Sequence, residues 1–252
     1  MGKEEFKLLQ HLSSQKAHIR VIPEHKRYIT YYQIARHYKL GLSHVFDKLN
    51  HSSVIIIEDD LDIAPDFFEY FSATRPLLDI DKTLYCVSAW NDNGKNYLID
   101  RKQPELLYRS DFFPGLGWMM TKNSLHYRGL FFTEHLTNIV INEVFVNFTN
   151  FNLRYLLQEN YDSAFLKRVY SAPLISLTEL ATFGNDTVRI QYKTLISYLR
   201  IANQLKIMRD FKDGVPRTAY LGVVTCFING TRIYIAPDRS SWSGYDPKWE
   251  AP

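Results

Sequence analysis

The sequence predicts an α/β protein on three observations. Four β-branched residues, Val54–Ile57, form an apolar run that ends in the acids Glu58-Asp59-Asp60. Apolar residues at helical spacing precede this run, and a second apolar run, Thr83–Trp90, follows after a further helical segment. Helical and strand patterns that alternate along a chain are typical of a sheet covered by helices.

Length and composition narrow the class of protein. The chain has 252 residues, and a hydrophobic content of 46% excludes a disordered tail. A net charge of +3 without a dense basic block gives no support to nucleic-acid binding. No apolar run approaches the roughly 18 residues of a membrane span, and the amino terminus lacks a signal-peptide pattern. We therefore expect neither an anchor nor a targeting signal within this sequence.

The run Val54–Ile57 reads as a strand buried on both faces, because an exposed strand would alternate polar and apolar residues. Its carboxyl end carries three acids, and Pro65 then begins a helix that we expect to reach Thr74. Ligands of open α/β sheets bind at this edge. The acids either hold Mg²⁺ or Mn²⁺, which prefer oxygen ligands, or solvate the loop and favour the positive end of the helix.

The preceding segments are predicted to form a short helix over 6–12, a strand over 18–22 and a longer helix from Tyr31 to Leu49. In the longer helix, apolar residues that include Tyr31, Ile34 and Phe46 define one stripe that we expect to be buried. His37 lies beside this stripe. From periodicity alone, a single helical histidine is a packed or surface group rather than a ligand contact.

Two later loops carry polar or turn-forming residues. Asn91–Lys95 follows the strand Thr83–Trp90 and is either a functional loop at the sheet edge or an ordinary tight turn. Further on, aromatic residues flank the turn Pro114-Gly115-Leu116-Gly117. Such a turn permits close backbone approach, and its aromatic neighbours are either a wall for a sugar ring or ordinary core.

The carboxyl-terminal part is predicted to be a small α+β domain. Helical patterns cover 153–159, 162–169 and 195–208, and an alternating strand covers 188–192. Two more strands flank Asn229-Gly230, a two-residue hairpin signal. We place the domain division at 1–141 and 142–252, with the second domain in a supporting role.

Cysteines and glycosylation triplets give weaker information. Cys86 and Cys226 lie far apart, so they are either one long-range disulfide or two free thiols. Asn-X-Ser/Thr triplets begin at Asn50, Asn147, Asn185 and Asn229. These triplets favour a lumenal compartment, although chance also produces some of them.

Three blocks of the sequence, Glu58–Phe71, Cys86–Lys95 and Asp111–Trp118, resemble in order the signature blocks of the N-acetylglucosaminyltransferase I family. This family comprises the Golgi alpha-1,3-mannosyl-glycoprotein 2-beta-N-acetylglucosaminyltransferases. The resemblance implies a GT-A (Rossmann-like) nucleotide-sugar domain followed by a smaller domain. It continues through four shorter blocks: 145–149, 165–170, 214–217 and 244–249.

The resemblance also implies roles for individual residues. Asp60 resembles the acid that binds Mn²⁺ at the UDP diphosphate, and Asp59 resembles the acid that contacts the nucleotide sugar. His37, in the string Ile34–Tyr38, resembles the nucleotide-contacting histidine of the family. The implied partners are UDP-GlcNAc as donor and a high-mannose N-glycan as acceptor, and the implied location is the Golgi lumen or membrane.

Two departures from the family pattern stand beside these matches. Its first nucleotide-binding strands precede anything found in this sequence, so the GT-A domain is expected to be incomplete. After Met120, the family continues through a segment with an Asp-Asp-Trp motif that supplies the catalytic base. In this chain that segment is missing, and Thr121–Gly129 is followed almost at once by residues that resemble a later part of the family sequence. The family partner of Cys86 also lies in that segment, so we predict a free thiol at Cys86.

We therefore assign no catalytic residue in this chain and expect impaired transfer. Asp92 and Asp111 are the nearby carboxylates that could replace the missing base. The alternative is a non-catalytic paralogue or splice product that binds glycan or associates with a full-length relative. The resemblance leaves open whether the chain is an active enzyme.

Overall fold

The computed structural model describes residues 26–58, 61–126, 130–132, 145–184, 186–212 and 215–241. The helix predicted over 6–12 and the strand predicted over 18–22 lie outside these residues. The chain divides into two compact units, 1–54 and 55–252. In the parts described, no helix has the length and apolar character needed to cross a membrane.

In the first unit, the predicted long helix is confirmed. It consists of the turn η2 (Lys26–Tyr28), the helix α1 (Ile29–Ser43) and the π-helical turn η3 (His44–Lys48). The predicted burial of its stripe is wrong for Tyr31 and Ile34, which are 71% and 49% exposed, although Phe46 is buried. A helical period shows that a helix has an apolar face, but it does not show that a second element covers that face.

Among the described residues, five strands form a mixed sheet in the order β1-β4-β2-β5-β3. β2 pairs with β4 antiparallel and with β5 in parallel, and β3 pairs with β5 antiparallel. The strands are β1 (Ser53–Ile56), β2 (Leu84–Ser88), β3 (Arg109–Ser110), β4 (Trp118–Thr121) and β5 (Leu130–Phe132). β1 is only partly buried, contrary to the prediction, because it lies at the edge of this sheet.

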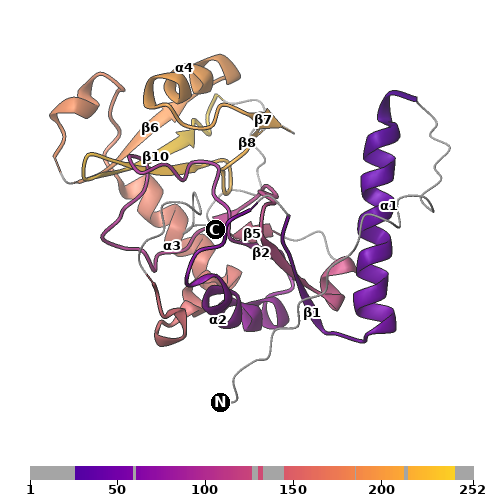
Figure 1. Ribbon diagram of the computed structural model, residues 1–252. Helices are drawn as coiled ribbons and strands as arrows, with labels where there is room; N and C mark the ends of the chain where they lie inside the picture. The colour runs from indigo at the N-terminus through magenta and orange to yellow at the C-terminus, as the bar shows by residue number, and fades with distance from the viewer. Residues whose placement is uncertain are drawn as a thin grey trace. The chain divides into compact units, whose positions relative to one another are not determined.

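The helix α2 (Phe67–Ile80) packs on β2 and β4 (Figure 1). It was predicted to end near Thr74, but it continues past Pro76. Proline removes one backbone donor from a helix. Here the last turn persists because Leu77 and Leu78 are both buried in the core.

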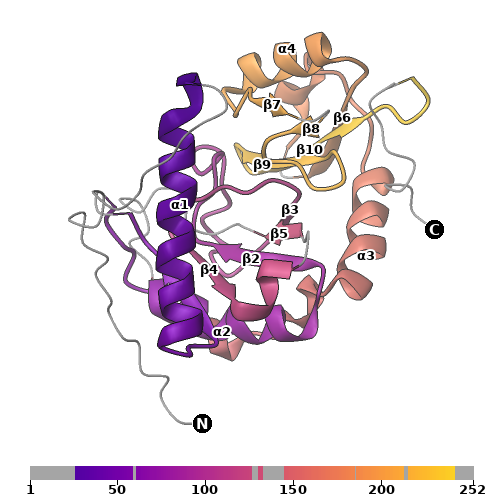
Figure 2. The same ribbon diagram turned by 90° about the vertical axis from the view of Figure 1, so that its right-hand side faces the viewer.

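A second sheet has the order β6-β10-β9, with β10 parallel to β6 and antiparallel to β9. Asn229 and Gly230 both have positive φ, 49° and 86°, which confirms the predicted hairpin turn. The elements of this region are β6 (Thr187–Tyr192), α4 (Leu195–Leu205), β7 (Phe211–Lys212), β8 (Val215–Pro216), β9 (Val224–Ile228) and β10 (Thr231–Pro237). Both views show α4 lying on this sheet (Figures 1 and 2).

The helix α3 (Gln158–Ser171) links the two sheets through its buried face. Phe165 contacts both Tyr220 and Tyr234, with ring centroids 5.7 and 6.1 Å apart. One core therefore contains residues from both sides of position 142, while a second core lies between α4 and the second sheet. The division at 141/142 stays a prediction. Short turns complete the described chain: η4 (Lys122–His126), η5 (Phe148–Asn150), η6 (Leu153–Leu156) and η7 (Glu179–Thr182).

Neither Cys86 nor Cys226 forms a disulfide, and both are buried. The predicted free thiol at Cys86 is therefore confirmed. Burial raises the pKa of the Cys86 thiol well above its ordinary value, because a thiolate there would lose its hydration. Cys86 is thus an unreactive core residue rather than a nucleophile.

Candidate functional site

The residues that the resemblance assigned to the donor site are only partly described. His37 is a partly exposed residue of α1, in the first unit. Glu58 is exposed just after β1, and Asp59 and Asp60 lie outside the described residues. Within the described ranges, no three His, Cys, Asp or Glu side chains are grouped so that they could hold a metal ion. The roles of His37, Asp59 and Asp60 stay predictions.

The polar loop after β2 is bonded to the segments that flank β7 and β8, an antiparallel pair that forms a sheet of its own. Asn91 Oδ1 accepts a hydrogen bond from the Asn93 amide at 2.8 Å, which forms a tight turn, one of the two interpretations that the sequence left open. The Asn93 side chain then reaches across the chain: it donates to Thr218 Oγ1 at 2.8 Å and accepts from the Met208 amide at 2.7 Å. These bonds fix the loop against Met208, which precedes β7, and against Thr218, which follows β8.

The Asp92 carboxylate contacts an arginine and the ring nitrogen of a tryptophan. Its Oδ2 lies 2.8 Å from Arg217 Nε, and its Oδ1 accepts from Trp90 Nε1 at 3.1 Å. The Nε–H of Arg217 is not aligned with the carboxylate, so this contact is a charge pair rather than a hydrogen bond. Arg217 also lies 3.6 Å from Asp210 and over the ring of Phe112. Both oxygens of Asp92 are therefore engaged.

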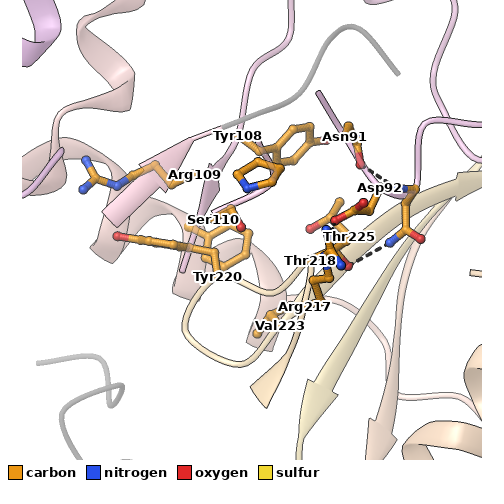
Figure 3. Close-up of a pocket in the computed structure, with 13 residues that line it drawn as sticks. Asn91, Asp92, Tyr108, Arg109, Ser110, Arg217, Thr218, Tyr220, Val223 and Thr225 are labelled. Atoms are coloured by element: carbon orange, nitrogen blue, oxygen red, sulfur yellow. Dashed lines mark hydrogen bonds and ion pairs between the residues drawn. The ribbon is translucent and has the colours of Figure 1, made fainter. Parts of the chain in front are cut away.

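A cavity of about 30 Å³ lies beside this loop (Figure 3). Asp92, Ser110, Thr218 and Tyr220 are among its lining residues, as is Tyr108, whose buried hydroxyl has no partner in the described part of the chain. This volume suits a small number of water molecules and is far below that of a sugar-nucleotide pocket. The cavity is thus a polar junction between the sheets, not a donor-binding cleft.

Asp111 stabilises a turn rather than facing a substrate. Its Oδ2 accepts from the Leu221 amide at 2.6 Å, and the Gly222 amide also favours the charged carboxylate. The carboxyl is buried although the residue as a whole is partly exposed. Burial raises the pKa of Asp111 to about 7, against the opposing effects of these amides and of Arg109.

Arg109 and Asp81 form a buried ion pair beneath the cavity. Arg109 Nη1 donates to Asp81 Oδ2 at 2.8 Å and to the Leu156 carbonyl at 2.7 Å. Asp81 also accepts from Thr83 and from the Gln158 amide. Burial alone would raise the pKa of Asp81, but these hydrogen bonds together lower it. The pair therefore joins the ends of α2, β3 and α3.

The turn Pro114–Gly117 approaches the protein core. Gly115, Leu116 and Gly117 all have positive φ, and a Cβ at Gly117 would lie 3.2 Å from the Phe67 ring. Trp118 is buried against Phe113, with ring centroids 4.9 Å apart. The backbone of this turn thus approaches Phe67 of helix α2 closely. This contact favours the interpretation that the aromatic residues around the turn belong to the core.

Sequence reasoning gave no role to Arg217, Arg109 or Asp81. Arg217 was present only as the last residue of a matching block, and Asp81 and Arg109 lie 28 positions apart. Charges that pair over such separations leave no periodic or local signal. Their importance follows from the fold alone.

Comparison with known proteins connects this architecture to a family. The model of the GNT-I family matches the chain in two stretches, residues 3–128 and 123–249. The chain is also 37% identical over 278 aligned residues to an alpha-1,3-mannosyl-glycoprotein 2-beta-N-acetylglucosaminyltransferase of Arabidopsis thaliana. The alignment covers 91% of this chain and 61% of that relative, so the chain spans about three fifths of the relative's length. The resemblance noted in the sequence is thereby confirmed: this chain belongs to the GNT-I family.

Proposed function

We propose that this chain derives from an inverting transferase that moves GlcNAc from UDP-GlcNAc, in β-1,2 linkage, to the α-1,3 mannose of a high-mannose N-glycan. The observation that carries the proposal is the family match over nearly the whole sequence, residues 3–128 and 123–249. The name of the Arabidopsis relative supports the same reaction. A GT-A arrangement of the first sheet and a Golgi location, at the membrane or in the lumen, belong to this proposal.

The donor end of the proposed site is the acidic corner after β1. Glu58, the first acid of that corner, is exposed. We assign Asp60 to Mn²⁺, Asp59 to the nucleotide sugar and His37 to the nucleotide. Bound Mn²⁺ would neutralise charge that develops on the departing diphosphate. The described residues alone do not assemble a metal site.

The acceptor end of the proposed site is incomplete. The two family matches overlap at 123–128, where the sequence predicted a missing segment. The aligned length of 278 exceeds the 252 residues of this chain, so the relative has residues within the alignment that this chain lacks. Both observations support the loss of the internal segment that carries the catalytic base.

Neither nearby carboxylate is placed to replace that base. A general base must reach the hydroxyl proton of the acceptor directly or through one water. Asp92 is occupied by Arg217 and Trp90, and Asp111 is buried against the amides of a turn. Losing general-base assistance typically lowers the rate by about 10²–10⁴-fold. We therefore propose that the chain is catalytically impaired.

The engagement of both carboxylates equally favours the second candidate function, a non-catalytic protein that binds glycan or associates with a full-length relative. The two candidates differ in turnover. Purified chain should be incubated with UDP-GlcNAc, a five-mannose N-glycan and Mn²⁺, with the Arabidopsis enzyme as a positive control. Slow but measurable transfer supports an impaired enzyme, and its complete absence together with retained glycan binding supports the second candidate.

Donor binding is tested separately from turnover. Calorimetric titration with UDP in the presence of Mn²⁺ should detect binding by the unmodified chain and much weaker binding by Asp60→Ala. Asp62→Ala is the matched control, because it removes another acid from the same loop. Equal affinity for UDP in all three proteins would exclude Asp60 as the metal ligand.

A further inference from the structure

The asparagines of the Asn-X-Ser/Thr triplets differ in backbone conformation. Asn50 and Asn229 have φ of 56° and 49°, a left-handed conformation in which asparagine is favoured for its own sake. Asn185 lies outside the described residues. Asn147 has φ of −88°, which any residue adopts. The backbone thus accounts for asparagine at positions 50 and 229, but not at position 147.

The triplet at Asn147 lies on the surface, and neighbouring residues that are buried hold it there. Phe145, Asn147 and Thr149 are exposed, whereas the alternate residues Val146 and Phe148 are buried in the core. Phe145 and Asn147 flank the buried Val146 in the segment before the turn η5, where residues two apart share a face. Thr149 lies within that turn, and its hydroxyl reaches the Asn147 side chain. The acceptor amide and the threonine hydroxyl are therefore displayed together.

Hydrogen bonds within the triplet agree with this presentation. Thr149 Oγ1 donates to Asn147 Oδ1 at 2.6 Å, and the Thr149 amide donates to Glu69 on α2 at 2.9 Å. Asn147 begins the turn η5, yet its side chain makes no hydrogen bond to the backbone of that turn. At Asn229, by contrast, the triplet's Thr231 is buried and donates to the Gly184 carbonyl.

An exposed aromatic ring accompanies the asparagine. Phe145 is 58% exposed and lies two residues before Asn147, on the same face of the segment. The described residues leave most of this apolar side chain uncovered. The face of a sugar ring carries C–H groups that pack well on aromatic rings, so a sugar attached to Asn147 would cover Phe145.

We propose that Asn147 is an N-glycosylation site and that the first sugar of its glycan packs on Phe145. The modification joins Asn147 Nδ2 to C1 of the first sugar of a lipid-diphosphate-linked oligosaccharide. The bond between C1 and the diphosphate oxygen breaks, the amide proton passes to a base of the transferring enzyme, and the lipid diphosphate leaves. In the cell this requires entry into the secretory pathway, so it rests on the lumenal location within the proposed function.

The test is expression of the full chain behind a cleavable secretion signal in eukaryotic cells. Peptide mass spectrometry after enzymatic deglycosylation in heavy-oxygen water should find Asn147 converted to labelled aspartate. Asn147→Asp keeps the oxygen that accepts from Thr149 but lacks the acceptor nitrogen, so it should fold and lose the glycan-dependent change in gel mobility. The matched control Asn229→Asp should keep the glycan at Asn147.

An unmodified Asn147 peptide, or a mobility change that persists fully in Asn147→Asp, would overturn the site. Because the added signal delivers the chain whatever its natural location, that result would not bear on GlcNAc transfer. Deglycosylation should also lower the melting temperature by about 2–4 °C. This shift should vanish in Phe145→Ala and persist in the control Phe151→Ala, which alters another exposed ring nearby. An equal shift in both variants would refute the contact with Phe145.

Discussion

Replacement of Asp81 by asparagine should destabilise the protein far more than the same change at Asp79. Asp81 pairs with Arg109 at 2.8 Å, and the two side chains are 7% and 0% exposed. Loss of one partner leaves a buried guanidinium unpaired, which typically costs about 3–5 kcal/mol. For a chain of this length, that free energy corresponds to a fall in melting temperature of about 6–20 °C.

Asp79 provides the matched control. It pairs with Arg75 at 2.6 Å on the surface of α2, with 48% of its side chain exposed. Exposed pairs at this helical spacing contribute only about 0.3–0.5 kcal/mol. Urea unfolding of Asp81→Asn and Asp79→Asn measures both losses in one assay. If Asp79→Asn lowered the free energy of unfolding as much as Asp81→Asn, burial would not determine how strongly an ion pair stabilises this protein.

Other predictions concern pH and backbone conformation. Asp111 has a folded pKa of about 7 against an unfolded value near 3.9, so its contribution to stability is full below about pH 4 and is lost as pH rises towards 7. Between pH 5 and 7, the free energy of unfolding measured in urea should therefore fall by about 2–3 kcal/mol less for Asp111→Asn than for the wild type. The same fall in both proteins would refute the raised pKa. Gly117→Ala should destabilise by about 1–2 kcal/mol or more, because it places a Cβ at positive φ and 3.2 Å from Phe67. The control Gly41→Ala, in open space on α1, should stabilise its helix by about 0.5–1 kcal/mol, and the same sign of effect in both variants, measured by thermal unfolding, would contradict this explanation.

Features set by neighbouring residues could be predicted from the sequence. The turn at Asn229-Gly230 was predicted because few residues tolerate positive φ, as both residues show. A turn over Asn91–Lys95 was also predicted from its asparagine and glycine residues, and the bond from the Asn93 amide to Asn91 Oδ1 forms it. The strand β2 and the helix α1 followed from periodicity. In each case, the cause lies within a few residues of the effect.

Features set by distant residues could not be predicted in this way. Periodicity showed the apolar face of α1 that includes Tyr31, but not that this face is largely exposed. The predicted end of α2 near Thr74 was wrong because the sequence did not show that Leu77 and Leu78 are buried in the core. At the candidate site, the bonds from Asn93 to Thr218 and Met208 span more than a hundred residues. The pattern of a single sequence does not show which distant residues form such pairs.

We propose that this chain keeps the acidic corner of the donor site of a GlcNAc transferase and lacks the segment that removes the acceptor proton. The most direct test of this proposal is kcat for GlcNAc transfer by the chain and by a chimera carrying the Arabidopsis segment inserted at 123–128, where the family matches overlap. The same insert with the aspartates of its Asp-Asp-Trp motif changed to asparagine is the control. We predict that the chimera gains about 10²–10⁴-fold over the chain and that the control insert gains little. A chain that already matches the Arabidopsis enzyme in kcat, or a control insert as effective as the intact one, would contradict the account.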